Sequence, residues 1–209
     1  MKLYLSSYRL GNDSQYLKDW ISNNDNKILL IPNARDAKKN AEVEKNKIAT
    51  HKKILEELGF EVRILDLKEY FKDNEKLKED IENYNAFCAI GGNAFVLRQA
   101  MKLSGFDKYL IDNINNKNIL YIGYSAGSCV VSKCLDGLQY VDEPINPYNN
   151  DEIIYEGINL VDYTIAPHYK SDNKESKLID NVVDYLENNN INYRALRDGD
   201  VIRVNWDEW

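Results

Sequence analysis

The chain has 209 residues, 44% of them hydrophobic, and a formal charge of −7. A hydrophobic share of this size argues against a disordered chain and suits one α/β domain over residues 1–209. The acidic balance argues against a nucleic-acid partner, which would need a basic surface, and no apolar run approaches the ~20 residues of a membrane span.

The cysteines indicate the cellular compartment. Cys88, Cys129 and Cys134 are an odd number without a C-x-x-C spacing, which predicts a reducing compartment, no disulfide framework and no zinc site. The opening residues lack the uninterrupted apolar core of a signal peptide. We therefore expect a cytoplasmic protein without a bound metal or cofactor.

Short apolar runs alternate with longer amphipathic stretches along the chain. The runs predict buried strands at 27–34, 61–67, 86–92, 118–124 and 163–169. Strands that alternate with helices predict βαβ units and a parallel sheet covered on both faces. Functional sites in such sheets lie beyond the carboxyl ends of the strands.

Two amphipathic stretches predict long helices. The first covers 36–60 and ends at Gly59, and the second covers 171–190 and is opened by Ser171 or Asp172. The expected inward faces are Ile48, Ile54, Leu55 and Leu58 in the first helix, and Leu178, Ile179, Val182, Val183 and Leu186 in the second. Residues 192–206 predict two short strands about a turn at Asp198-Gly199.

A serine stands between two glycines where the strand at 118–124 meets a stretch of small residues. The segment Gly123-Tyr124-Ser125-Ala126-Gly127 fits the G-x-S-x-G pattern of a nucleophile on a sharp strand-to-helix turn. The helix that follows would place free N–H groups where an oxyanion forms. The alternative is a tight turn that uses small residues for packing only.

A nucleophilic serine needs a base, and the chain has two histidines. His51 lies among lysines in the first predicted helix, so we expect it on a solvated face. His168 ends the strand at 163–169, where a parallel strand would deliver it to the functional edge. These positions favour His168 as the base. The alternative is a histidine at a strand end that only forms a hydrogen bond to a loop.

The acid that would orient the imidazole cannot be chosen by spacing. Asp142, Glu143, Asp172 and Asp198 are all candidates, and Asp198 also suits a hairpin turn because Asp-Gly is favoured there.

The segment Gly91-Gly92-Asn93 follows another predicted strand. Its glycines would let the backbone approach a ligand and direct an N–H at it, and a plain strand-to-helix turn is the alternative.

These stretches together resemble the serine peptidases typified by dipeptidase E, the α-aspartyl dipeptidase. The elbow Gly123–Gly127 is similar to the family's G-W-S-A-G, and 91–95 is similar to its G-G-N-T-F turn with Ala94 in place of threonine. Asp198-Gly199 stands where the family has a glutamate-glycine pair. The resemblance covers most of the chain and implies a three-layer α/β fold of the class I glutamine amidotransferase-like, flavodoxin-like type.

The resemblance also implies residue roles and a substrate. Ser125 would be the nucleophile and His168 the base, with Asp198 as the orienting acid. Gly92 and Ala126 would supply the oxyanion N–H groups, and Asn93 would contact the substrate. The expected substrate is a small peptide with an acidic N-terminal residue, limited in size by the loop at 143–152. Its cation remains open among Arg98, Lys170 and Arg197.

Two other functions fit the pattern less closely. An α/β-hydrolase esterase shares the serine motif, but its histidine usually comes last in the chain, whereas a long helix and two strands are predicted after His168. A noncatalytic binding module with an amidotransferase-like fold is the other alternative. The sequence leaves a homodimer open.

Overall fold

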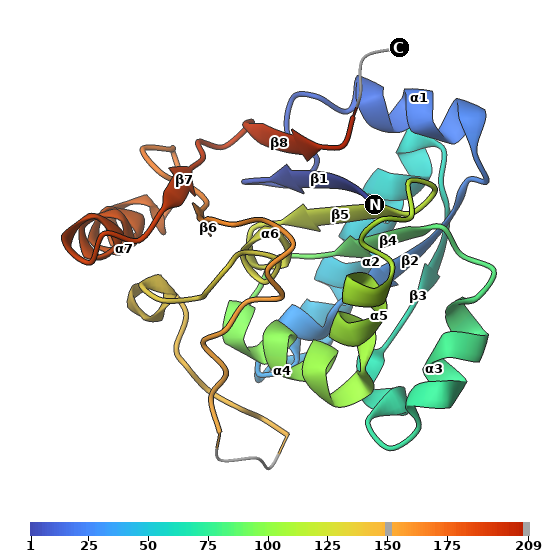
Figure 1. Ribbon diagram of the computed structural model, residues 1–209, viewed down its shortest axis with the longest axis horizontal. Coiled ribbons are helices and arrows are strands. Elements are labelled where there is room, and N and C mark those ends of the chain that lie inside the picture. Colours follow the sequence, from blue (N-terminus) through green and yellow to red (C-terminus); the bar gives the residue numbers. More distant parts are fainter. Residues whose placement is uncertain (149–151, 207–209) are drawn as a thin grey trace.

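The computed structural model describes residues 1–148 and 152–206, and a six-stranded sheet forms its centre (Figure 1). Its strands follow the order β3-β2-β4-β5-β1-β8, and neighbours are parallel except that β8 runs antiparallel to β1. Their bounds are Glu61–Ile64, Lys27–Ile31, Ala86–Ala89, Leu120–Tyr124, Lys2–Ser6 and Val201–Val204, in that order. The predicted mostly parallel α/β sheet is confirmed.

Helices cover both faces of this sheet (Figure 1). On β2, Ile28 and Leu30 belong to the apolar cluster shared with α1 and α2, whereas Leu29 and Ile31 belong to the cluster shared with α3, α4 and α5. Both sets are buried, so the strand is apolar on its two sides. The bounds are Gln15–Asn23 for α1, Ala41–Leu58 for α2, Asn74–Ile81 for α3, Ala94–Ser104 for α4 and Phe106–Asp112 for α5.

The end of the chain differs from the predicted pair of neighbouring strands. The run at 163–169 forms β6 (Thr164–Ala166), which lies outside the central sheet and pairs in parallel with β7 (Tyr193–Ala195). The last strand, β8, pairs instead with the unpredicted strand β1. A turn does form at Arg197–Asp200, where the Asp200 N–H donates to the Arg197 carbonyl at 2.9 Å. The local turn signal was correct, but the two strands joined different sheets.

The two predicted helices are both present but begin later than expected. α2 begins at Ala41, where the Asn40 side chain accepts from the Val43 N–H, and it ends at Gly59 with φ of +118° as predicted. α7 (Ser176–Asn188) begins after the expected caps, because residues 171–173 form hydrogen bonds elsewhere. Leu178 is 42% exposed, although the other four residues of its expected face are buried.

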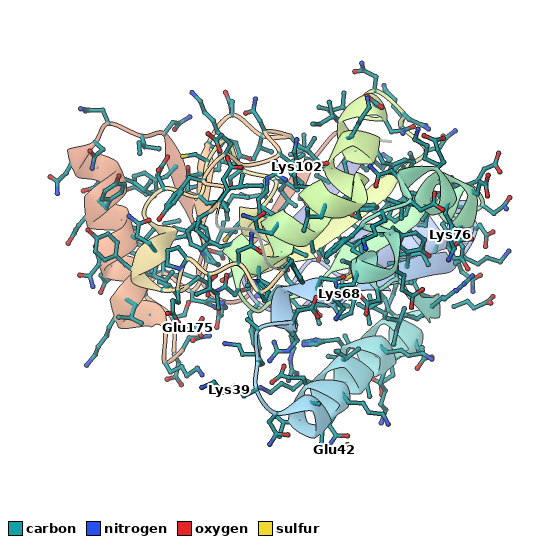
Figure 2. The ribbon with its side chains drawn as sticks, turned by 90° about the horizontal axis from the view of Figure 1, so that it is seen from below. Lys39, Glu42, Lys68, Lys76, Lys102 and Glu175 are labelled. Atoms are coloured by element: carbon teal, nitrogen blue, oxygen red, sulfur yellow. The ribbon has the colours of Figure 1, made fainter. Side chains whose placement is uncertain are left out.

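Lys39, Glu42, Lys76 and Lys102 are exposed, and Figure 2 shows Lys39 and Glu42 at the edge of the molecule. The three cysteines are free. Over the ranges that the structure describes, none of the helices combines the length and the apolar character needed to cross a membrane.

Candidate active site

Ser125 lies at the junction of β5 and the short helix α6 (Ala126–Cys129). Its φ of +51° and ψ of −117° fall outside the conformations that serine ordinarily adopts. The neighbouring glycines make this turn feasible. A Cβ at Gly127 would lie 2.0 Å from the Ala89 carbonyl oxygen, and one at Gly123 would lie 2.4 Å from the Gly127 oxygen. Tight packing of two backbone segments therefore requires glycine at both positions.

The structure brings Ser125, His168 and Asp198 into contact, although 43 and 30 positions separate the successive pairs. His168 Nε2 lies 3.1 Å from Ser125 Oγ, and its Nδ1 lies 2.6 Å from Asp198 Oδ1. A carboxylate at Nδ1 favours the tautomer with the proton on Nδ1. Nε2 is then free to accept the proton of the serine hydroxyl, which is the arrangement needed to activate an oxygen nucleophile.

Polar groups from separate segments hold this arrangement in place. Ser7, which follows β1, donates to Asp198 Oδ1 at 2.9 Å and accepts from the His168 N–H at 2.8 Å. Ser171 Oγ accepts from the Asp198 N–H at 2.7 Å, and Asn173 Nδ2 donates to Asp198 Oδ2 at 3.3 Å. Sequence reasoning missed these three residues. Ser171 was assigned to a helix cap, and the strand before Ser7 was not predicted.

The other candidate acids have different surroundings. Asp142 Oδ2 accepts from the Ala94 N–H at 2.8 Å and so caps α4, and the loss of hydration around this carboxyl raises its pKa to about 7. The Glu143 backbone oxygen accepts from Asn93, and Asp172 is exposed. Among the described residues, Asp198 is the acid that has a hydrogen bond to His168.

Two backbone N–H groups are available for an oxyanion. Ala126 is the first residue of α6, and Gly92 belongs to the turn that passes beside Ser125. Within residues 1–148 and 152–206, neither N–H donates to another protein group. A Cβ at Gly92 would lie 2.3 Å from the Ala34 carbonyl oxygen, so the turn is pressed against the chain after β2.

The Asn93 side chain is used within the protein. Its Oδ1 accepts from the Val96 N–H at 3.0 Å, and its Nδ2 donates to the Glu143 carbonyl at 2.7 Å. It is 6% exposed and does not line the pocket at Ser125. The structure therefore gives Asn93 a capping position on α4 and not the expected position in contact with a substrate.

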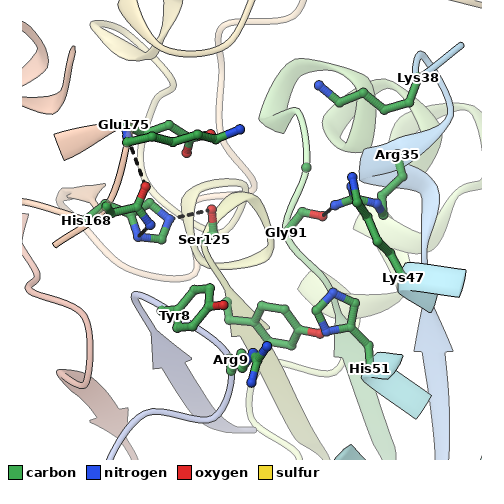
Figure 3. A pocket seen from close by; sticks show the side chains of 14 residues that line it. Tyr8, Arg9, Arg35, Lys38, Lys47, His51, Gly91, Ser125, His168 and Glu175 are labelled. Atoms are coloured by element: carbon green, nitrogen blue, oxygen red, sulfur yellow. Dashed lines mark hydrogen bonds between the residues drawn. The ribbon is translucent and has the colours of Figure 1, made fainter. Parts of the chain in front are cut away.

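Ser125 and His168 open onto a pocket of about 260 Å³. Figure 3 shows His168 on one side of Ser125 and Arg35, Lys38 and Lys47 on the other, and Arg9 also lines the pocket. These cations come from the loop after β1, from the segment after β2 and from α2. The sequence pointed instead to Arg98, Lys170 and Arg197. Arg98 pairs with buried Asp107 at 2.9 Å, and the other two are exposed outside this pocket.

The position of His51 corrects the expectation of a solvated helix face. Its ring packs against Tyr124 with centroids 5.2 Å apart and lines the same pocket (Figure 3). Burial, with the charges of Arg35 and Arg9, lowers the pKa of His51 to about 4. Its buried Nδ1 has no partner among the described residues. Lysines on either side of it in sequence concealed this inward position.

Comparison with known proteins identifies the family. A family model described as peptidase family S51 matches residues 6–209. An uncharacterized peptidase of Listeria monocytogenes is 34% identical over 123 residues, which cover 57% of this chain and 56% of that protein. A peptidase E of a Nostoc species is 32% identical over 124 residues, covering 56% of this chain and 43% of that protein. These matches thus span about half of each relative.

Solved structures support the fold. A Listeria monocytogenes protein described as a peptidase E superposes with a TM-score of 0.79 at 24% identity, covering 99% of this chain and 95% of that one. A peptidase from an acI-B1 Actinobacterium gives a TM-score of 0.64 at 17% identity, with coverages of 97% and 82%. The resemblance to dipeptidase E is confirmed by the family match, and the chain belongs to peptidase family S51.

Proposed function

We propose that the protein is a serine peptidase that hydrolyses short peptides, with Ser125 as nucleophile, His168 as general base and Asp198 as the acid that orients it. One observation carries the proposal. Ser125 is held in a strained conformation on the strand-to-helix turn, and its Oγ lies 3.1 Å from a histidine that contacts a carboxylate. Strain of this kind is typical of functional sites.

The geometry supports acyl transfer through a covalent intermediate. His168 Nε2 takes the proton of Ser125 Oγ as that oxygen attacks the peptide carbonyl, and the Asp198 carboxylate stabilises the imidazolium. The Gly92 and Ala126 N–H groups bind the oxyanion that forms. His168 then gives the proton to the leaving amine, and a water molecule repeats the cycle on the acyl-enzyme. A single oxyanion donor contributes about 10²–10³ in kcat.

The pocket supports a small substrate with a negative charge. Its volume of about 260 Å³ lies just below the ~300–1,000 Å³ that is common for small-molecule sites. The leaving amine must lie near His168, which protonates it. The acyl residue, which in a dipeptide is the N-terminal one, would then extend to the other side, where Lys38 lies, and Arg9 lines the same pocket. We therefore propose a dipeptidase that prefers an N-terminal aspartate.

The two alternatives have weaker support. In an α/β-hydrolase esterase the histidine usually follows the acid in sequence, whereas His168 precedes Asp198, and the family match also favours a peptidase. A noncatalytic binding module would have no need for the strained Ser125 or for its contact with His168.

A neutral fluorophosphonate probe tests the proposal. We expect the probe to label wild type at Ser125 and to leave Ser125→Ala unlabelled. The same variant should lower kcat for dipeptides by about 10⁴ or more, because the members of a triad act as a unit, with little change in Tm. Labelling of Ser125→Ala, or retention of a tenth of the wild-type kcat, would contradict the nucleophile assignment.

A further inference from the structure

The peptide bond between Gly91 and Gly92 lies directly beside the nucleophile. A Cβ at Gly91 would stand 3.2 Å from Ser125 Cβ and 3.5 Å from Ser125 Oγ. This peptide is trans, like every peptide bond that the structure describes, so the Gly91 carbonyl and the Gly92 N–H point in opposite directions. Whatever holds the carbonyl therefore also sets the direction of the N–H.

Arg35 holds the carbonyl side of this peptide. Its Nη1 donates to the Gly91 oxygen at 2.9 Å, and Figure 3 shows that oxygen turned away from Ser125 and toward Arg35. The Gly92 N–H is consequently directed to the side on which Ser125 lies. No second donor to the Gly91 oxygen occurs among residues 1–148 and 152–206.

Backbone hydrogen bonds hold the Ala89–Ile90 peptide before this turn and the Gly92–Asn93 peptide after it, but among the described residues none holds the Gly91–Gly92 peptide. The Ile90 N–H donates to the Ile31 carbonyl at 3.2 Å, and the Asn93 N–H donates to the Ala34 carbonyl at 2.7 Å. Between these two bonds stand two glycines, whose backbones rotate more freely than those of other residues. A flipped Gly91–Gly92 peptide would place a carbonyl oxygen where an oxyanion forms, and the two would repel each other.

Arg35 is itself anchored by α2. Its Nε donates to the Glu44 carboxylate, and both side chains are shielded from solvent, at 13% and 12% exposure. Burial alone would raise the pKa of Glu44, but hydrogen bonds from Arg35 and Lys47 outweigh it and hold that pKa below its usual value. The guanidinium thus binds a carboxylate and a carbonyl at once, a two-point geometry that a lysine ammonium reproduces poorly.

We propose that Arg35 is a positioning residue for the oxyanion site: it fixes the Gly91–Gly92 peptide so that the Gly92 N–H faces the developing oxyanion. The inference rests on the proposed function, because it needs an oxyanion at Ser125. The positive charge on the carbonyl side also polarises the peptide, which makes its N–H a stronger donor.

The test compares Arg35→Met with Lys45→Met, which removes one positive charge from α2 outside the pocket. Loss of an oxyanion donor costs about 10²–10³ in kcat. Arg35→Met keeps the donor but frees its orientation, so we expect kcat and the rate of labelling by the neutral fluorophosphonate to fall by about 10- to 100-fold. The labelling rate of Lys45→Met should stay within about twofold of the wild-type rate, because the charge of Lys45 is exposed and screened by salt.

Three outcomes would overturn the inference. The first is labelling of Arg35→Met at the wild-type rate, with a change in KM only. Arg35 would then act only by binding the negative charge of the substrate. The second is an equal loss in Lys45→Met, which would indicate a general effect of charge. The third is a wild-type labelling rate in Arg35→Lys, because lysine keeps the positive charge but not the two-point geometry of the guanidinium.

Arg35→Met could also destabilise the fold, so Glu44→Gln provides a second route. This variant leaves Arg35 in place and weakens its anchor, and we expect labelling to slow several-fold with Tm followed in parallel. An unchanged rate in Glu44→Gln would count against the positioning role. Absence of labelling in wild type would instead remove the proposed function, and the inference with it.

Discussion

At the scale of single residues, the contacts of Asp198 explain how a short acidic side chain reaches the imidazole. The Asp198 N–H is held by Ser171 Oγ at 2.7 Å, and its carboxylate receives hydrogen bonds from Ser7 and Asn173. These contacts fix the backbone and both carboxylate oxygens. Oδ1 is thereby directed to His168 Nδ1 at 2.6 Å.

Asp198→Asn separates an orienting role from a role in the turn. An asparagine amide would present an N–H to Nδ1 and favour the wrong tautomer, so we expect kcat to fall by about 10³–10⁴ with little change in Tm. Asp200→Asn is the matched control, because Asp200 Oδ2 accepts from the Arg197 N–H in the same turn at 2.8 Å without contacting His168. Near-wild-type turnover in Asp198→Asn would show that Asp198 serves only the turn and does not orient His168.

His51 gives the stability of the protein a defined dependence on pH. Its pKa of about 4 in the folded state is below the ~6.5 of an unfolded histidine. Between these values the unfolded chain binds the proton more readily, so the contribution of neutral His51 is present above pH ~6.5 and is lost as the pH falls to about 4. Discounted for partial exposure, this contribution is about 1–2 kcal/mol.

We therefore expect His51→Gln to reduce the loss of Tm on going from pH 7 to pH 4. The difference should be about 2–8 °C, since 1 kcal/mol shifts the Tm of a protein of this size by ~2–4 °C. The measurement is Tm against pH for both proteins. Parallel curves would show that His51 titrates alike in the folded and unfolded states.

The proposed catalytic residues could be named as candidates from the sequence more easily than the residues that support them. Ser125 was identified because its signal is local, a serine between glycines at the end of an apolar strand. His168 was identified because one histidine followed a predicted strand. Ser7 and Asn173 approach Asp198 only after segments distant in the chain come together, and no local pattern records such a contact.

At the scale of elements, two glycines near Ser125 serve different purposes. Gly127 is required by the packing of α6 against β4, where a Cβ would come within 2.0 Å of the Ala89 carbonyl oxygen. Gly91 has a looser contact, since its Cβ would lie 3.2 Å from the Ser125 side chain and meet no backbone within 3.5 Å. Substitution at Gly127 should therefore affect the fold, and substitution at Gly91 the reaction.

We expect Gly127→Ala to destabilise the protein by about 3 kcal/mol or more, because rigid backbone cannot yield to the added methyl group. That loss corresponds to a decrease in Tm of at least ~6 °C. Gly91→Ala should melt within a few degrees of wild type but lower kcat by about tenfold, because its methyl group displaces Ser125 Oγ. Thermal melts and kcat of both variants decide the matter, and an unaltered Tm in Gly127→Ala would contradict the close packing.

The elements themselves could be predicted where one local signal was sufficient. Continuous apolar runs gave β2, β4 and β5, because strands covered on both faces have no polar side. The run at 61–67 gave β3, which is an edge strand with only Val62 buried. The partners of the final strands could not be predicted. A turn at Asp198-Gly199 fits a hairpin as well as it fits the observed path, and the antiparallel pairing of β8 with β1 depends on an edge some 200 residues earlier in the chain.

At the scale of the whole molecule, the charge of the pocket is opposite to that of the protein. The formal charge is −7, yet Arg9, Arg35, Lys38, Lys47 and Lys174 line the pocket, and Glu175 is the carboxylate among the described residues that line it. Part of this charge is neutralised, because Glu44 pairs with Arg35 and Lys47. Selection of an acidic substrate would therefore depend on short-range contacts inside the pocket, since a net charge of −7 provides no general attraction for anions.

This balance leads to a prediction about substrates. We expect kcat/KM for Asp-Leu to exceed that for Asn-Leu and Ala-Leu by about 10- to 150-fold, which corresponds to the ~1.5–3 kcal/mol of a charge-assisted hydrogen bond. Lys38→Met and Arg9→Met should reduce this preference while leaving kcat/KM for Ala-Leu little changed, because the neutral side chain makes no ionic contact. Equal values for Asp-Leu and Ala-Leu in wild type would defeat the acidic preference. Ready cleavage of N-acetyl-Asp-Leu would defeat the requirement for a free amine, and it would leave the roles of Ser125 and His168 intact.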